Sequence, residues 1–313
     1  MSVAARQHFK VRIPMAGRAA YEAVIVVESA DGLEGLGEAP LLPGRDAEVA
    51  IHAAEETARL DLEARQAGIP LAELLGGVRR RQVECSALVS DPRADRVAAE
   101  VERAYADGFR CFKLKAVNGG AMLDQVRLGA ARWAAGPQAR LRLDFNGSLG
   151  VTDAAVRLPS LGPFQLELLE QPLPPGATVA EWSELADRVH APLAADESLA
   201  LQGEDLKQAG FGLAIKLATV GGPRAALELA RGATGPVTLG SSYETSIGLA
   251  AALHVACALE REPLACGLAT IGMLEQDLAV GLVAGRPLLR LPAAPGLGVE
   301  LDRRALARYR LDS

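Results

Sequence analysis

The chain has 313 residues, half of them apolar, which is long for one domain and enough for two with a sizeable core. A formal net charge of −6 and the lack of a long basic block disfavour a nucleic-acid partner. No apolar stretch approaches the ~18 uninterrupted residues of a membrane span, so no membrane association is expected.

The four cysteines show no C-x-x-C spacing, and the first residues lack a basic segment followed by an apolar one. Both observations favour a reducing, cytoplasmic location. The four histidines form no zinc-binding pattern, so carboxylates are the credible metal ligands. His254 is most simply interpreted as a packed helix residue.

Residues 1–78 are predicted to form a small α+β capping domain. Strands are expected at 21–29 and 35–40, an alanine-rich helix at 46–66, and a short helix through 70–77 that ends on two glycines. Extended chain in 279–313 is expected to return to this domain.

Residues 79–278 have a different pattern, in which short β-rich stretches alternate with longer helical ones such as 94–106 and 223–233. The predicted strands are 83–89, 111–117, 141–146, 166–171, 192–198, 213–219, 236–242 and 264–270. Almost continuously apolar strands that alternate with helices predict an α/β fold with a parallel, TIM-like β/α barrel. An open doubly wound sheet is the alternative, but no G-x-G-x-x-G follows the first strand.

Lys113 and Lys115 lie two residues apart on a predicted strand, and therefore on the same face. Each ammonium disfavours the proton of the other, so at least one lysine is expected to have a lowered pKa. A lowered pKa suits a general base that works near neutral pH. The alternative is an edge strand with two solvated lysines.

Further charged residues fall at the C-terminal ends of predicted strands, where β/α barrels carry their catalytic groups. Asp144, Glu170 and Asp196 follow one another at equal intervals of 26 residues, which predicts one level on three adjacent strands. Three converging carboxylates require a cation, and a set of oxygen ligands suits Mg²⁺. For any one of them, a solvated loop residue is the alternative.

Lys115 on the second barrel strand and Lys216 on the sixth are four strands apart in a ring of eight, so they are expected to face each other. A substrate carboxylate on the metal would hold its α-carbon between these lysines. The arrangement suits proton abstraction next to a carboxylate, with stabilisation of the resulting enediolate.

The ordered set of K-x-K at 113–115, D-x-N at 144–146, E-Q-P at 170–172, A-D-E-S at 195–198 and Lys216 resembles the enolase superfamily, muconate-lactonizing subgroup. The resemblance extends over nearly the whole chain. It implies a (β/α)7β barrel, with an N-terminal capping domain completed by the C-terminal segment, and a Mg²⁺-dependent enzyme.

Within that subgroup the chain is most similar to the o-succinylbenzoate synthases of menaquinone biosynthesis, through 35–44, 240–249 and the placement of Arg142 two residues before Asp144. The resemblance implies dehydration of 2-succinyl-6-hydroxy-2,4-cyclohexadiene-1-carboxylate, a small-molecule substrate. Lys115 would remove the α-proton and assist syn loss of hydroxide, and Lys216 would stabilise the enediolate. Lys113 would tune Lys115. The implied Mg²⁺ ligands are Asp144, Glu170 and Asp196.

Candidates for substrate contacts are Asn146, Arg142, Ser241, Ser242, Gly267 and Arg18. Arg18 lies in segment 12–20, which could form a mobile capping loop. Ordinary loop capping is the alternative for the two serines, and an ion pair with a neighbouring carboxylate is the alternative for Arg142.

Two departures from related sequences matter. The stretch "ACGLAT" at 265–270 lacks the Asp-x-Asp of dipeptide epimerases, and Cys85-Ser86-Ala87 replaces the V-N-A of many synthases. Rival interpretations are an N-succinylamino acid racemase, a non-catalytic metabolite-binding barrel and an aldolase-like Schiff-base barrel. No obligate protein partner is evident.

Overall fold

The computed structural model describes residues 5–117 and 120–311. The chain falls into two compact units. Unit 1 comprises Met1–Glu84, Ile215–Arg231 and Leu239–Ser313, and unit 2 comprises Cys85–Ala214 and Gly232–Thr238. The domain boundaries expected near residues 78 and 278 remain a prediction.

Unit 2 is built on a curled sheet in which strand order follows chain order. Its strands are β5 (Ala87–Val89), β6 (Cys111–Lys115), β7 (Arg140–Asp144), β8 (Leu168–Glu170), β9 (Leu193–Ala195), β10 (Gly212–Ile215) and β11 (Val237–Leu239). Pairing from β5 through β10 is parallel. The order never reverses, so the sheet has no switch point, and the doubly wound alternative is wrong.

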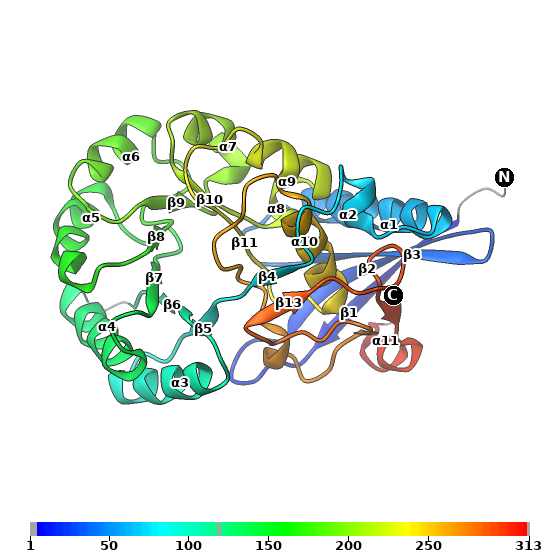
Figure 1. Cartoon of the computed structure of the whole chain (residues 1–313), viewed down its shortest axis with the longest axis horizontal. Helices are drawn as coiled ribbons and strands as arrows, with labels where there is room; N and C mark the ends of the chain where they lie inside the picture. Colours follow the sequence, from blue (N-terminus) through cyan, green and yellow to red (C-terminus); the bar gives the residue numbers. More distant parts are fainter. Residues whose placement is uncertain (1–4, 118–119, 312–313) are drawn as a thin grey trace. The chain divides into compact units, whose positions relative to one another are not determined.

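The helices of unit 2 lie on the outer side of this curled sheet (Figure 1). They are α3 (Ala94–Ala106), α4 (Ala121–Ala135), α5 (Val151–Arg157), the 3₁₀ helix η1 (Pro159–Phe164), α6 (Val179–Ala186) and α7 (Leu199–Gln208). Helix α3 has the bounds that the sequence pattern predicts. The middle strands are buried on both faces, as parallel strands covered by helices require.

Three predicted strands differ from the structure. The stretch 213–219 is a strand only as far as Ile215, and Leu217–Val220 forms a short helix, so Lys216 directly follows the strand instead of lying within it. The stretch 83–89 divides into β4 (Gln82–Glu84) and β5, because the chain changes partner at Cys85 and Ser86. β4 pairs antiparallel with β13 (Leu288–Arg290). The predicted eighth strand, 264–270, is not a regular strand: Gly267 forms an isolated parallel bridge with Gly240, and its amide donates to Leu239 O at 2.8 Å.

Unit 1 begins with an antiparallel sheet of β1 (Ala5–Ile13), β2 (Tyr21–Ala30) and β3 (Leu33–Pro40). Helix α1 (Ala47–Ala67) packs on β3, and α2 (Leu71–Leu74) follows it. Asp46 caps α1 by accepting from the amides of Glu48 and Val49. A Cβ atom on Gly37 would lie 1.9 Å from Ala54 O, so only glycine permits this close approach of strand and helix.

The later elements of unit 1 are α8 (Leu217–Val220), α9 (Pro223–Ala230), α10 (Ser246–Ala258), the 3₁₀ helix η2 (Ile271–Met273), β12 (Ala279–Val280), β14 (Glu300–Leu301) and α11 (Arg303–Tyr309). The end of the chain lies against its beginning, because Arg310 bridges to Val11 and Leu311 N donates to Lys10 O at 2.8 Å. None of the helices in the described part of the chain is both long and apolar enough to cross a bilayer.

His254 is fully buried in α10 and connects three parts of unit 1. Its Nδ1 accepts from Ala72 N at 3.0 Å, and its Nε2 faces Leu297 O at 3.2 Å. The ring is therefore neutral, with its proton on Nε2. Burial lowers the pKa of His254 to about 4.

We expect the protein to lose stability as the pH falls from about 6.5 toward 4. In this range the unfolded chain binds a proton on His254 that the folded chain excludes, at a cost of up to about 3 kcal/mol. Urea unfolding of the wild type and of His254→Gln across this range measures the effect. Two parallel curves of unfolding free energy against pH would contradict it.

Candidate active site

Lys113 and Lys115 extend from the same face of β6, while Phe112 and Leu114 are fully buried. β6 lies between β5 and β7, so these are not edge-strand lysines. Lys115 Nζ donates to Asp144 Oδ2 at 2.6 Å and to Asn146 Oδ1 at 2.9 Å. The two lysines therefore meet carboxylates of the neighbouring strands rather than bulk solvent.

Lys113 bridges two of the predicted metal ligands. Its Nζ donates to Glu170 Oε1 at 2.6 Å and lies 2.9 Å from Asp144 Oδ2. Both carboxylates are buried. The ammonium of Lys113 thus supplies the positive charge that this pair needs.

Strand register explains how these groups meet. Lys115 pairs with Asp144, and Asp144 pairs with Glu170, so the three side chains lie side by side across β6, β7 and β8. Glu170 pairs with Ala194, however, and Asp196 lies two residues further along. The expectation of one common level holds for Asp144 and Glu170 but not for Asp196, because strands of a closing sheet are staggered.

Electrostatics around Lys113 differ from the expectation of a lowered lysine pKa. Burial disfavours its charged form, but the negative charges of Asp144, Glu170 and Asp196 outweigh burial and raise the pKa of Lys113. Lys113 therefore remains protonated at neutral pH. This charge state suits a counterion and not a base.

Gln171 joins the loop after β8 to the loop after β9. Its Oε1 accepts from Asp196 N at 2.8 Å and from Ser198 N at 3.0 Å, and its Nε2 donates to Ser198 Oγ at 2.8 Å. The side chain is completely buried. Gln171 thereby fixes Asp196 relative to Glu170. Sequence reasoning missed this function, although Gln171 is the middle residue of the E-Q-P motif.

Arg142 is buried and donates from Nε to Glu167 Oε2 at 2.6 Å. Glu167 also lies 3.5 Å from Cys111 Sγ. This geometry favours the ion-pair alternative for Arg142. A substrate contact of Arg142 remains a prediction.

The other predicted contact residues belong to unit 1. Ser241 Oγ lies 2.8 Å from Thr270 Oγ1, and Ser242 N donates to Glu244 Oε2 at 2.5 Å. Arg18 Nη1 donates to Tyr243 OH at 2.8 Å, and its guanidinium lies 5.2 Å from the centre of the Tyr243 ring. Within unit 1, segment 12–20 is thus held against the chain that follows β11.

The chemistry of the carboxylate set fits a divalent cation. Asp144, Glu170 and Asp196 offer only oxygen donors, which magnesium prefers. Among the described residues, no group of three His, Cys, Asp or Glu side chains is already arranged as a ligand set. The ammonium of Lys113 lies between the two carboxylates instead, so a cation bound there would have to displace it.

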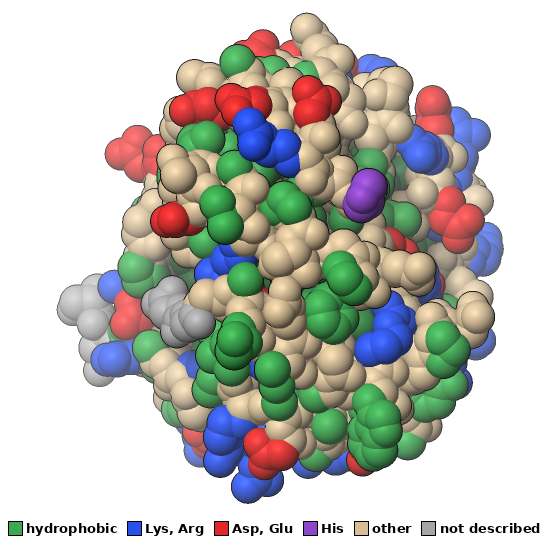
Figure 2. Space-filling view, turned by 90° about the vertical axis from the view of Figure 1, so that its left-hand side faces the viewer, with side chains coloured by type: hydrophobic (Ala, Val, Ile, Leu, Met, Phe, Trp, Pro, Cys, Tyr) green, Lys and Arg blue, Asp and Glu red, His purple; other side chains and the backbone are tan. Residues whose placement is uncertain are grey.

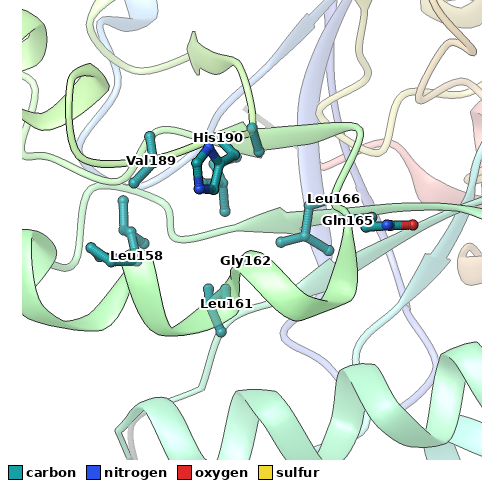
Figure 3. Close-up of a pocket in the computed structure, with 10 residues that line it drawn as sticks. Leu158, Leu161, Gly162, Gln165, Leu166, Val189 and His190 are labelled. Carbon is teal, nitrogen blue, oxygen red and sulfur yellow. The ribbon is translucent and has the colours of Figure 1, made fainter.

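A separate pocket of about 440 Å³ lies in unit 2 (Figure 3). Leu158, Leu161, Leu166, Val189 and His190 line it. These residues precede β8 and β9, so the pocket lies at the N-terminal ends of these strands, opposite to the carboxylates. Figure 2 shows the side of the molecule that lies on the left in Figure 1, with apolar side chains scattered among charged ones.

The model of the family described as enolase C-terminal domain-like matches residues 96–305. The chain belongs to this enolase family. The match includes all of α4 through α10, and with them every carboxylate and lysine of the candidate site.

Curated enolase-family relatives named o-succinylbenzoate synthase are similar to this chain. The protein from Thermobifida fusca is 39% identical over 194 residues, 60% of this chain and 59% of the relative. The protein from Mycobacterium tuberculosis strain H37Rv is 38% identical over 211 residues, 64% of this chain and 62% of the relative. The matches thus span about three fifths of the length of these relatives.

Solved enolase-family structures share the fold. The muconate lactonizing enzyme from Klebsiella pneumoniae has a TM-score of 0.88 at 26% identity and covers 98% of this chain and 99% of its own. That from Pseudomonas putida has a TM-score of 0.89 at 24% identity, with the same coverage. These likenesses confirm the predicted α/β, TIM-like barrel with an N-terminal cap.

Proposed function

We propose that the protein is a Mg²⁺-dependent o-succinylbenzoate synthase of menaquinone biosynthesis. The observation that carries the proposal is that Lys113 contacts the buried carboxylates of Asp144 and Glu170, and Lys115 contacts Asp144, at the C-terminal ends of adjacent barrel strands. The names of the curated relatives support the same activity. The substrate is then a small cyclohexadiene carboxylate, and the cytoplasm is the expected location.

In the proposed reaction, neutral Lys115 accepts the proton from the α-carbon of the substrate carboxylate, which leaves an enediolate. Lys115, now an ammonium, returns a proton to the departing hydroxyl, so that the C–O bond breaks and water leaves on the same face. Asn146 holds Lys115 through its Oδ1 at 2.9 Å. Lys216 contributes positive charge that stabilises the enediolate.

The proposed metal ligands are Asp144, Glu170 and Asp196. Bound Mg²⁺ would supply positive charge for the substrate carboxylate as negative charge develops on it. Lys113 holds the same carboxylates together before the metal binds. Its proposed function is to keep their geometry without acting as a base.

We expect the purified chain to convert 2-succinyl-6-hydroxy-2,4-cyclohexadiene-1-carboxylate to o-succinylbenzoate with Mg²⁺ and not with excess EDTA. Ultraviolet absorbance of the aromatic product measures the reaction. Exchange of the α-proton of N-succinylamino acids in D₂O, without dehydration, would support a racemase instead. Tight binding of the substrate with no exchange and no turnover would support a metabolite-binding barrel.

A further inference from the structure

Two carboxylates that the proposed reaction does not use are buried together in unit 1. Glu38 lies on β3, and Glu244 follows β11. Both carboxylate oxygens of Glu38 accept two hydrogen bonds. Its Oε1 accepts from Tyr21 OH at 2.8 Å and from Thr245 N at 3.0 Å. Its Oε2 accepts from Thr245 Oγ1 at 2.7 Å and from Gly248 N at 2.9 Å. These bonds fix Glu38 rigidly.

Glu244 is held less completely, by Ser242 N and by its own backbone amide. Burial and the negative charge of Glu38 raise the pKa of Glu244 to about 7, while the positive charge of Lys216 opposes the shift. Tyr21 also faces this pair, and burial with the two carboxylates keeps its hydroxyl protonated by raising its pKa. Glu38 and Lys216 are thus charged groups that shift the pKa of Glu244, and Tyr21 is a neutral group beside them.

Packing brings Lys216 into the same cluster. A Cβ atom on Gly240 would lie 3.4 Å from both Cγ and Cε of Lys216, so the lysine stem runs along Gly240. Gly240, Glu38, Glu244 and Gly248 line one cavity of about 20 Å³, which has room for a single water molecule. Polar groups on its wall give such a water partners.

Gly248 shows how closely Glu244 is confined. A Cβ atom at position 248 would lie 2.5 Å from Glu244 Cγ and 3.2 Å from Glu38 Oε2. No larger residue fits at 248 unless Glu244 moves. The position of the Glu244 side chain therefore depends on helix α10, which carries Gly248.

We propose that Glu244 is a positioning residue that orients the Lys216 ammonium through its negative charge, and that Glu38 fixes Glu244 in this position. The pair ties Lys216 to strand β3 of the same unit. The catalytic role of Lys216 rests on the proposed function, but the electrostatic attraction between Glu244 and Lys216, here called the hold, does not. This hold is strongest when Glu244 is ionised, above about pH 7, and weakens below it.

The test measures the proton affinity of Lys216 directly in the full-length chain. Trace acetylation with acetic anhydride across a pH series, followed by mass spectrometry, gives the pKa of each lysine. We expect Glu244→Gln to lower the pKa of Lys216 by ~1 unit, because it removes a nearby negative charge. Glu34→Gln, at an exposed ion pair with Arg303, is the control and should leave Lys216 unchanged.

Glu244→Asp keeps the charge and shortens the side chain, so it should restore most of the Lys216 pKa and provide the test if the glutamine variant does not fold. Turnover is a second readout: Glu244→Gln should lower kcat, with little change in KM, and Glu244→Asp should recover part of it. An unchanged Lys216 pKa in Glu244→Gln overturns the proposal. A shifted pKa in a chain that lacks dehydratase activity supports the proposal and overturns the proposed function alone.

Discussion

Lys115→Met is expected to lower turnover of the cyclohexadiene carboxylate by about 10²–10⁴-fold while the protein remains folded. Methionine has about the length of lysine but cannot accept the α-proton. The side chain of Lys115 is partly exposed, and Asp144 keeps its contacts with Lys113 Nζ at 2.9 Å and with Asn146 N at 3.0 Å. Steady-state kinetics with saturating Mg²⁺ measure the loss.

The matched control is Lys10→Met, which removes an exposed lysine near Glu22. It should leave both turnover and stability unchanged. If Lys115→Met turned over within tenfold of the wild type, a group other than Lys115 would have to be the base. A parallel loss of unfolding free energy would show instead that Lys115 is needed mainly for structure.

Lys113→Met is expected to destabilise the metal-free protein by about 3–5 kcal/mol, because two buried carboxylates lose their shared counterion. Mg²⁺ should restore much of this stability, since the proposed cation would neutralise Asp144 and Glu170. Wild-type protein should gain less from Mg²⁺, because Lys113 competes for the same oxygens. Urea unfolding of the wild type and of Lys113→Met, each in EDTA and in millimolar Mg²⁺, measures the four unfolding free energies.

Removal of Mg²⁺ is thus expected to lower the unfolding free energy of Lys113→Met more than that of the wild type. Lys10→Met again provides the control for loss of one lysine. An equal effect of Mg²⁺ on Lys113→Met and on the wild type would show that the cation does not bind where Lys113 lies. No loss of stability in EDTA would contradict the counterion function of Lys113.

The barrel strands could be predicted because they are short, β-rich and apolar, and because several carry a charged residue at or just after the C-terminal end. Asp144 and Glu170 end β7 and β8, and Asp196 directly follows β9. The stretch at 264–270 looked similar, but its β structure consists of isolated pairing, which local propensity does not encode. The change of partner at Cys85 was likewise not visible in the sequence.

The polar partners of the site could not be predicted. Glu167, which directly precedes β8, pairs with Arg142 on β7, and Glu38 accepts from Thr245 across 207 residues of chain. Local periodicity carries no signal for such pairs, because they depend on how distant elements pack. The raised pKa of Lys113 was missed for the same reason: its repulsion from Lys115 is a local feature, whereas the carboxylates that outweigh it lie on other strands.

The division of the chain has a consequence for the order of folding. Unit 2 comes almost entirely from one continuous stretch, Cys85–Ala214, whereas unit 1 is assembled from three stretches that unit 2 interrupts. Contacts such as Val11 with Arg310 close a loop of nearly the whole chain, and such contacts form late. During synthesis β1 to β3 are therefore expected to remain without the later parts of unit 1 until Cys85–Ala214 has been made.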